Sequence, residues 1–88
     1  MYTIKLTRKA EKGYNDLFLE DYRKKVNELV PVLEINPYPA RMYDMIKLAD
    51  NTYRIRLGRV RVQYTVFEEE KVILVHKIEL RDDSTYKK

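Results

Sequence analysis

The sequence predicts an α+β domain with the element order β-α-α-β-β-β, in which a mainly antiparallel sheet carries a helical hairpin on one face. Three observations lead to this prediction. Apolar and polar residues alternate at the start of the chain and again after residue 52, as they do in half-buried strands. Between these segments, residues 8–33 repeat apolar side chains at helical spacing. A chain of 88 residues can bury one core but not two, so we expect a single domain over residues 1–88.

The first strand is expected over residues 2–6, and a helix follows it. Tyr2, Ile4 and Leu6 share one face of the strand. Thr7 can cap the helix, because its hydroxyl oxygen can accept a hydrogen bond from an N–H group of the first turn. The apolar stripe of this helix comprises Ala10, Tyr14, Leu17 and Phe18.

A second apolar stripe follows at the same helical spacing. It comprises Tyr22, Val26, Leu29, Val30 and Leu33. The two stripes could belong to one long helix or to a helical hairpin, and we favour a hairpin whose second helix begins near Glu20. Pro31 predicts a kink, or an end of the helix near Leu33, because proline has no N–H for the helical hydrogen bond.

The second half of the chain changes to a period of two. Residues 36–39 contain two prolines and stop the helix. Residues 40–50 are expected to form a loop, with room for one turn of helix. Strands are expected at 53–57, 60–66 and 71–80, separated by polar turns at 58–59 and 68–70. Residues 72–75 are apolar on both faces, which is typical of a strand inside a sheet.

The composition excludes several kinds of protein. Without cysteine there is no disulfide framework and no thiolate metal site. One histidine and one serine leave little for a Ser–His triad or a histidine metal cage, so an enzyme built from this chain would use Arg, Lys, Tyr, Asp and Glu. No apolar run approaches the roughly 20 residues of a membrane span, and the first residues lack a signal-peptide core. We therefore expect a soluble cytoplasmic protein with no membrane contact, metal or cofactor.

Basic residues concentrate in the predicted hairpin. The chain carries 18 basic and 14 acidic residues, a net charge of +4, and residues 51–65 hold four arginines and no acid. Arg54 and Arg56 share one face of their strand, and Arg59 and Arg61 share one face of the next. Like charges across a hairpin are destabilising, which indicates an anionic ligand, and the guanidinium fork suits phosphate. The alternative is a solvated sheet face whose arginines are neutralised by acids elsewhere.

The hairpin and its surroundings resemble the RelE/ParE superfamily of bacterial and archaeal toxins. The family pattern is roughly Tyr-Arg-Ile-Arg-x-Gly-x-x-Arg, then a further strand, then an Arg with a Tyr about five residues later. The matching segments are Lys47-Leu48, the run from Tyr53 to Tyr64, and the tail from Arg81 to Tyr86. The element order and the length also fit, so the resemblance covers nearly the whole chain.

The resemblance implies one of two activities. RelE-branch proteins are mRNA interferases that cut messenger RNA in the ribosomal A site, and ParE-branch proteins poison DNA gyrase. The RelE branch has basic residues at the positions of Arg54, Arg56, Arg61 and Arg81 and a tyrosine at that of Tyr86, and this chain matches all five. Two departures stand out: some relatives carry lysine in place of the first two arginines, and many carry histidine where this chain has Leu80. A histidine-based mechanism is therefore not expected.

RelE-type cleavage needs no metal, because the RNA 2′-OH attacks the adjacent phosphorus and leaves a 2′,3′-cyclic phosphate and a 5′-OH. Tyr86 is the expected base, since nearby arginines favour its phenolate. Arg54, Arg56 and Arg61 would hold the non-bridging oxygens, and Arg81 would stabilise the transition state. Further RNA-backbone contacts are expected from Lys47, Arg59 and Lys87. Against the catalytic interpretation, Asp82 and Asp83 could pair with Arg81.

The resemblance also implies partners: the ribosome with its mRNA, a cognate antitoxin protein, and promoter DNA only through the antitoxin complex. Two alternatives stay open, a ParE-like gyrase inhibitor that is not an enzyme and a catalytically inactive family member that binds RNA or a partner. His76 lies in phase with Leu74 and Ile78, and we expect it to be a half-buried structural histidine.

Overall fold

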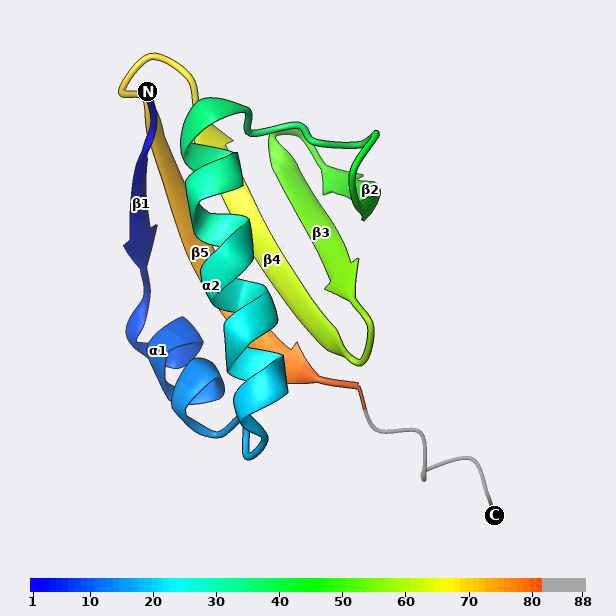
Figure 1. Cartoon of the computed structure of the whole chain (residues 1–88). Coiled ribbons are helices and arrows are strands. Elements are labelled where there is room, and N and C mark those ends of the chain that lie inside the picture. The colour runs from blue at the N-terminus through cyan, green and yellow to red at the C-terminus, as the bar shows by residue number, and fades with distance from the viewer. Residues whose placement is uncertain (82–88) are drawn as a thin grey trace.

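The computed structural model describes residues 1–81 of the chain. The element order is β1 (Thr3–Leu6), α1 (Arg8–Asn15), α2 (Glu20–Ile35), β2 (Asp44–Ala49), β3 (Thr52–Leu57), β4 (Val60–Phe67) and β5 (Val72–Leu80) (Figure 1). This confirms the predicted α+β class and the helical hairpin, and it adds one strand, β2.

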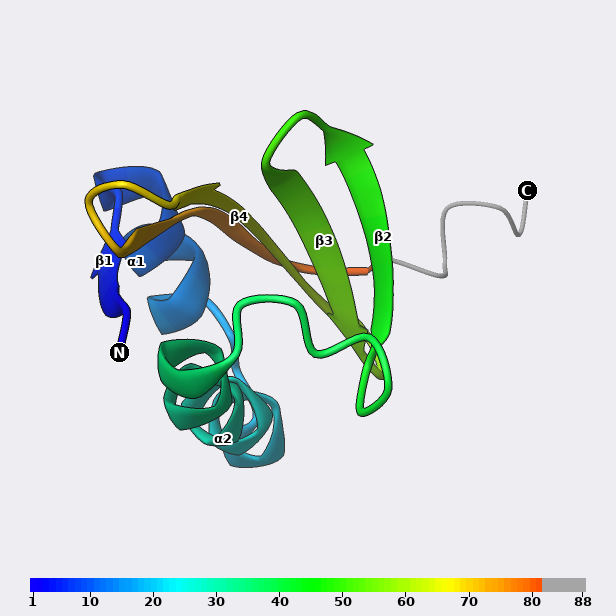
Figure 2. The ribbon, with the colours of Figure 1, turned by 90° about the horizontal axis from the view of Figure 1, so that it is seen from above.

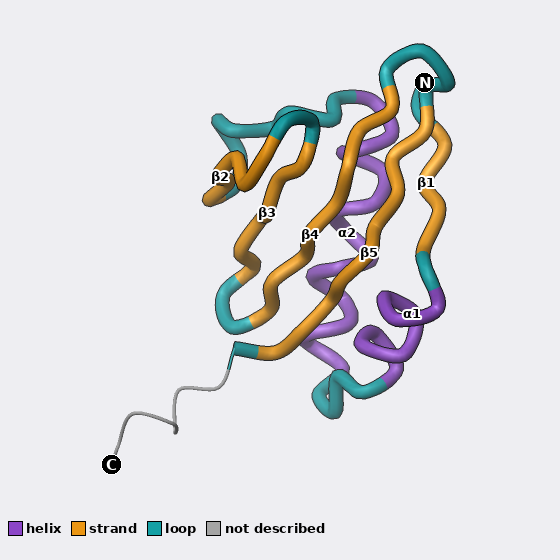
Figure 3. The backbone as a smooth tube through the Cα atoms, turned by 180° about the vertical axis from the view of Figure 1, so that it is seen from behind, coloured by secondary structure: helices purple, strands orange, loops and turns teal. Residues whose placement is uncertain are grey.

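The strands form a single sheet in the order β1-β5-β4-β3-β2. β1 is parallel to β5, and the other neighbours are antiparallel, so the sheet is mainly antiparallel as predicted. β5 has a partner on each side, which confirms the internal position expected from its apolar residues. Figure 3 shows the sheet from the side opposite α2.

The first helix begins as predicted and ends early. The Thr7 hydroxyl accepts a hydrogen bond from the Ala10 N–H at 3.1 Å, which makes Thr7 the N-cap. The helix stops at Asn15, so the predicted stripe was too long: Leu17 and Phe18 lie in the turn before α2. Leu17 still reaches the core, because the Arg23 guanidinium donates to its carbonyl oxygen and secures the turn.

The second helix begins at Glu20, as predicted, and continues through Pro31 to Ile35. The expected end near Leu33 was therefore two residues too early. Leu29 and Leu33 are buried on either side of the proline. Burying two leucines contributes roughly 3–6 kcal/mol, enough to offset the ~3 kcal/mol that a proline costs inside a helix. Asn36 then caps the helix, and its N–H donates to the Val32 carbonyl at 2.8 Å.

The prediction of a loop over residues 40–50 was wrong, because Asp44–Ala49 forms β2 and pairs antiparallel with β3. β2 lies at the edge of the sheet, and only Met45 is even half-buried. A strand that buries almost nothing shows no alternation of apolar and polar residues, so its sequence carried no strand signal.

One face of the sheet packs against the helices. Buried side chains on this face come from alternate residues of β3, β4 and β5, and α2 supplies Val26, Leu29 and Leu33. α2 lies along this face, and α1 lies beside β1 (Figure 2) and contacts β5 at Ile78. The other face is not covered by either helix, and we call it the open face. In the described part of the chain, no helix is long and apolar enough to cross a membrane.

Candidate functional site

The arginines of the β3–β4 hairpin lie on the open face. Ile55 and Leu57 of β3 are buried beneath the helices, and the intervening Arg54 and Arg56 are half-buried on the other face. On β4 the same alternation places Arg61 on the open face. The structure therefore brings Arg54, Arg56 and Arg61 together on one surface, as the spacing of the residues indicated.

Sheet register sets four charged residues side by side across this face. Asp44 of β2 lies opposite Arg56, which lies opposite Arg61 of β4, which lies opposite Glu79 of β5. Because directly opposed residues point to the same side of a sheet, the four form one row, which we call the charged rung. Its two arginines are adjacent, and an acid lies at each end.

The two acids of the charged rung hold their arginines differently. Asp44 Oδ2 accepts hydrogen bonds from Arg56 Nε at 3.0 Å and from Arg56 Nη2 at 2.9 Å. Glu79 is shared, with Oε2 at 3.7 Å from Arg61 Nη1 and Oε1 at 3.5 Å from Lys77 Nζ. Arg56 is thus tightly paired, whereas Arg61 lies farther from its carboxylate, which also contacts Lys77. Sequence reasoning missed both acids, because their relation to the arginines depends on register between strands.

Arg54 differs from both arginines of the charged rung. It lies opposite Ile46 of β2 and Gln63 of β4, and it makes no ion pair with any described residue. The Nε–H groups of Arg54 and Arg61 are buried and have no hydrogen-bond acceptor within residues 1–81. Unlike Arg56 and Arg61, Arg54 therefore has no carboxylate within residues 1–81 that neutralises its charge.

Two further arginines lie where the sheet ends beside the hairpin turn. The Arg81 N–H donates to the Arg59 carbonyl at 2.5 Å, which extends the β4–β5 pairing by one residue. Glu79 of the charged rung is only two residues before Arg81, so Arg81 follows that rung directly along the chain. Both Arg59 and Arg81 make other interactions as well.

Of the remaining predicted site residues, the structure places only Lys47. Lys47 pairs with Tyr53, and Tyr53 alternates with Arg54, so register places Lys47 on the face opposite the arginines. It is exposed on the edge strand. Tyr86 and Lys87 lie outside the described residues, as do Asp82 and Asp83.

His76 also lies on the open face, in phase with Leu74 as expected but not with Ile78, which is buried. A register shift near Gln63 places two residues, His76 and Lys77, between the buried Val75 and Ile78. His76 is half-buried, as expected, and its Nε2 lies 3.2 Å from Thr65 Oγ1. Burial lowers the pKa of His76, and the charges of Lys9 and Lys77 lower it further. A bulge has no regular sequence signal, although a polar pair inside an apolar strand was a sign of one.

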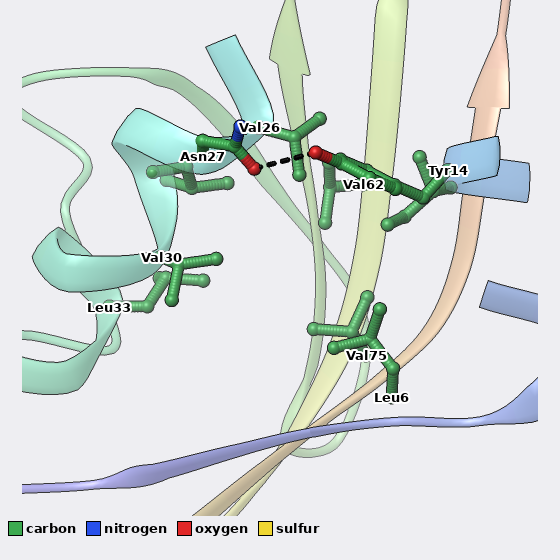
Figure 4. A pocket seen from close by; sticks show the side chains of 10 residues that line it. Leu6, Tyr14, Val26, Asn27, Val30, Leu33, Val62 and Val75 are labelled. Atoms are coloured by element: carbon green, nitrogen blue, oxygen red, sulfur yellow. Dashed lines mark hydrogen bonds between the residues drawn. The ribbon is translucent and has the colours of Figure 1, made fainter. Parts of the chain in front are cut away.

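An apolar cavity lies on the helix side of the sheet, away from the arginines. It has a volume of about 280 Å³ and is lined mainly by aliphatic side chains, among them Leu6, Val26, Leu33 and Val75 (Figure 4). Within the lining, the Tyr14 hydroxyl donates to Asn27 Oδ1 at 2.9 Å. Such a lining does not suit an anion. No group of three or more potential metal ligands occurs within residues 1–81.

Known proteins share both the sequence and the fold of this chain. Residues 4–83 match the family described as the ParE toxin of type II toxin–antitoxin systems. The RelE1 protein of Methanocaldococcus jannaschii is 32% identical over 83 residues, which cover 92% of this chain and 91% of that protein. A chain of the archaeal RelE–RelB complex from Pyrococcus horikoshii OT3 is 31% identical with a TM-score of 0.82, covering 93% of this chain and 97% of that one. The isolated E. coli RelE toxin shares the fold at 20% identity, with a TM-score of 0.77 over 93% of this chain and 86% of that one.

Proposed function

Because this chain belongs to the RelE/ParE family of type II toxins, we propose that it is a RelE-like endoribonuclease that cleaves messenger RNA in the ribosomal A site. The observation that carries the proposal is the set of three arginines, Arg54, Arg56 and Arg61, on one open sheet face. Guanidinium groups bind phosphate oxygens in a planar, two-pronged arrangement, and an uncovered sheet face can receive an extended strand of RNA.

The proposed reaction uses the 2′-OH of RNA as the nucleophile. The 2′ oxygen bonds to the adjacent phosphorus and its proton passes to a base, while the bond to the 5′ oxygen breaks and that oxygen takes up a proton from the solvent. The products are a 2′,3′-cyclic phosphate and a 5′-OH, so the reaction consumes no water, and we propose that it proceeds without a metal. DNA has no 2′-OH and cannot react in this way.

We assign the arginines to charge stabilisation. Arg54 makes no ion pair with a described residue and would bind a non-bridging oxygen directly, with Arg56 and Arg61 beside it. Arg81, at the end of β5, would stabilise the charge that develops in the transition state. Tyr86 is proposed as the base on its match to the family pattern alone. A phenol is a weak base near neutral pH, which fits a site that depends on the ribosome to position the RNA.

The test is cleavage on programmed ribosomes, read by primer extension. The wild type should produce new mRNA 5′ ends at the A-site codon. Arg81→Ala, Tyr86→Phe and Arg54→Ala should each lower the cleavage rate by about 10²-fold or more, as the loss of a transition-state contact does. Arg8→Ala, an exposed arginine at the start of α1, is the matched control and should cut like the wild type. Undiminished cleavage by Arg81→Ala and Tyr86→Phe would refute the site assignment.

A gyrase inhibitor is the second candidate, because the matching family model is described as a ParE toxin. This function predicts inhibition of DNA supercoiling and no mRNA cleavage. A folded protein that neither cuts mRNA nor inhibits gyrase, but binds RNA, would be a catalytically inactive family member.

A cognate antitoxin is the proposed protein partner. The Pyrococcus horikoshii relative was crystallised as a RelE–RelB complex, and the two archaeal matches cover nearly the whole chain. Any contact with promoter DNA would come through that antitoxin.

A further inference from the structure

We infer that the carboxylates of the charged rung, Asp44 above all, compete with RNA phosphate for the arginines and so limit the affinity of this face for RNA. The inference rests on the proposed RNA-directed function. It assigns to Asp44 a role that its position on an edge strand, outside the arginine hairpin, did not suggest.

The contact geometry shows what the competition involves. One oxygen of Asp44 accepts from both Nε and Nη2 of Arg56, at 3.0 and 2.9 Å. These two donors form the side of the guanidinium that would otherwise bind a phosphate in a two-pronged manner. A phosphate that engages Arg56 in this way must displace Asp44. A phosphate held by the remaining donors would lie close to a carboxylate of the same charge.

The exposure of the pair permits such an exchange. The Asp44 side chain is 55% exposed and that of Arg56 is 37% exposed. Ion pairs in contact with water contribute little net stability, so an incoming phosphate can replace this one readily. Asp44 is also the first residue of β2, which pairs only with β3. Its release from Arg56 therefore disturbs no packed core.

The arginines of the open face differ in how strongly a carboxylate competes with phosphate for them. Arg54 makes no ion pair with any described residue, and Arg61 shares Glu79 with Lys77 at distances of 3.5–3.7 Å. Phosphate should therefore bind Arg54 with little competition. At Arg61 it competes with Glu79, which also contacts Lys77, and at Arg56 it competes with Asp44, which makes two hydrogen bonds to that guanidinium. Asp44 is thus the acid whose removal should change RNA binding most.

The experiment measures binding of a short, fluorescently labelled single-stranded RNA by anisotropy, between about 50 and 200 mM salt. Asp44→Asn should bind about fivefold more tightly at the low-salt end, the factor expected for loss of one surface ion pair. Its plot of log affinity against log salt should be steeper by about 0.7, because one more phosphate contact releases counterions from a single strand. In an Arg56→Gln background, Asp44→Asn should have neither effect.

The matched control is Asp16→Asn, at the residue that caps the C-terminal end of α1. Asp16 is also an exposed aspartate in an ion pair, with its Oδ2 3.1 Å from Lys12 Nζ and its side chain 65% exposed. The substitution changes the net charge by the same amount at a position outside the sheet. The slope for Asp16→Asn should equal that of the wild type. Glu79→Gln provides a second test that does not involve β2, and it should also tighten binding.

The outcomes separate this inference from the proposed function. Equal slopes for Asp44→Asn and Asp16→Asn would overturn the competition. Weaker binding by Asp44→Asn would also overturn it, and would show instead that Asp44 positions Arg56 for RNA. Absence of RNA binding by both the wild type and Asp44→Asn at low salt would reject the inference as well. The ribosome cleavage assay tests the proposed function independently of all three results.

Discussion

At the scale of single residues, Gly13 shows how closely α1 approaches the sheet. A Cβ atom at this position would lie 1.8 Å from the carbonyl oxygen of Ile78 in β5. Any side chain there would push the helix away from the strand, and the close approach therefore requires glycine. The sequence showed only that a glycine weakens a helix; the contact explains why this one is present.

Gly13→Ala is expected to destabilise the protein, although alanine favours helix formation. The overlap with a strand carbonyl should lower the free energy of unfolding by about 1–3 kcal/mol, as overpacking of a core does. Urea denaturation followed by circular dichroism gives this value. Asn15→Ala, an exposed substitution in the same helix, should change stability by no more than about 0.5 kcal/mol. A Gly13→Ala protein as stable as the wild type would contradict the close approach.

At the scale of elements, Tyr64 fastens the segment between α2 and β2 to the sheet. Its side chain is fully buried on β4, and its hydroxyl donates to the Pro37 carbonyl at 2.7 Å. Burial raises the pKa of Tyr64, so the phenol stays protonated and remains a donor. This hydrogen bond helps to set where the chain leaves α2 on its way to β2, the strand that carries Asp44.

Tyr64→Phe should keep the packing of the ring and lose this hydrogen bond. The Pro37 carbonyl would then lack its partner, and the free energy of unfolding should fall by about 1–2 kcal/mol. The control is Tyr14→Phe. The Tyr14 hydroxyl makes an exposed hydrogen bond to Asn27, so its removal should lower the free energy of unfolding less. Thermal unfolding of both variants compares the two losses. An equal loss for both would show that burial of the Tyr64 hydroxyl is unimportant.

At the scale of the whole molecule, Glu68 joins three distant segments. It lies in the turn between β4 and β5, and its two carboxylate oxygens accept hydrogen bonds from Tyr2 near the N-terminus and from Tyr38 after α2. The Tyr2 bond measures 2.6 Å. The hydrogen bonds from Tyr2 and then Tyr38 lower the pKa of Glu68 below its ordinary value of 4.5; desolvation opposes this, and the charge of Lys71 favours it.

This lowered pKa links Glu68 to stability in acid. A carboxyl group with a lower pKa in the folded state stabilises the fold above its unfolded pKa, and that contribution disappears as the pH falls through the folded pKa. The wild type should therefore lose stability between about pH 5 and pH 3, and Glu68→Gln should lose less. Melting temperatures across this range measure the difference. Glu69→Gln, one residue further in the same turn, is the control and should behave like the wild type.

Local patterns were sufficient to predict most of the elements. Thr7 caps α1, α2 begins at Glu20, and the alternation in β3 and β4 correctly separated buried residues from the open face. Apart from the early end of α1, the predictions that were wrong involve non-local packing. α2 continues past Pro31 because its leucines are buried, β2 exists because β3 offers a pairing edge, and Ile78 loses the phase of His76 at a bulge opposite β4.

The sequence by itself determined the fold class and the common face of Arg54, Arg56 and Arg61, because side-chain alternation is a property of each strand. Only the tertiary structure decided which charges meet. Asp44 faces Arg56, Arg56 faces Arg61, and Glu79 faces Arg61 because of the register between strands. Each acid lies across a strand pairing that contains a register shift, between Lys47 and Ala49 for β2–β3 and between Gln63 and Tyr64 for β4–β5, and the alternation within one strand does not specify such shifts. The same holds for Lys47, which lies beside the hairpin in the sequence but on the opposite face of the sheet.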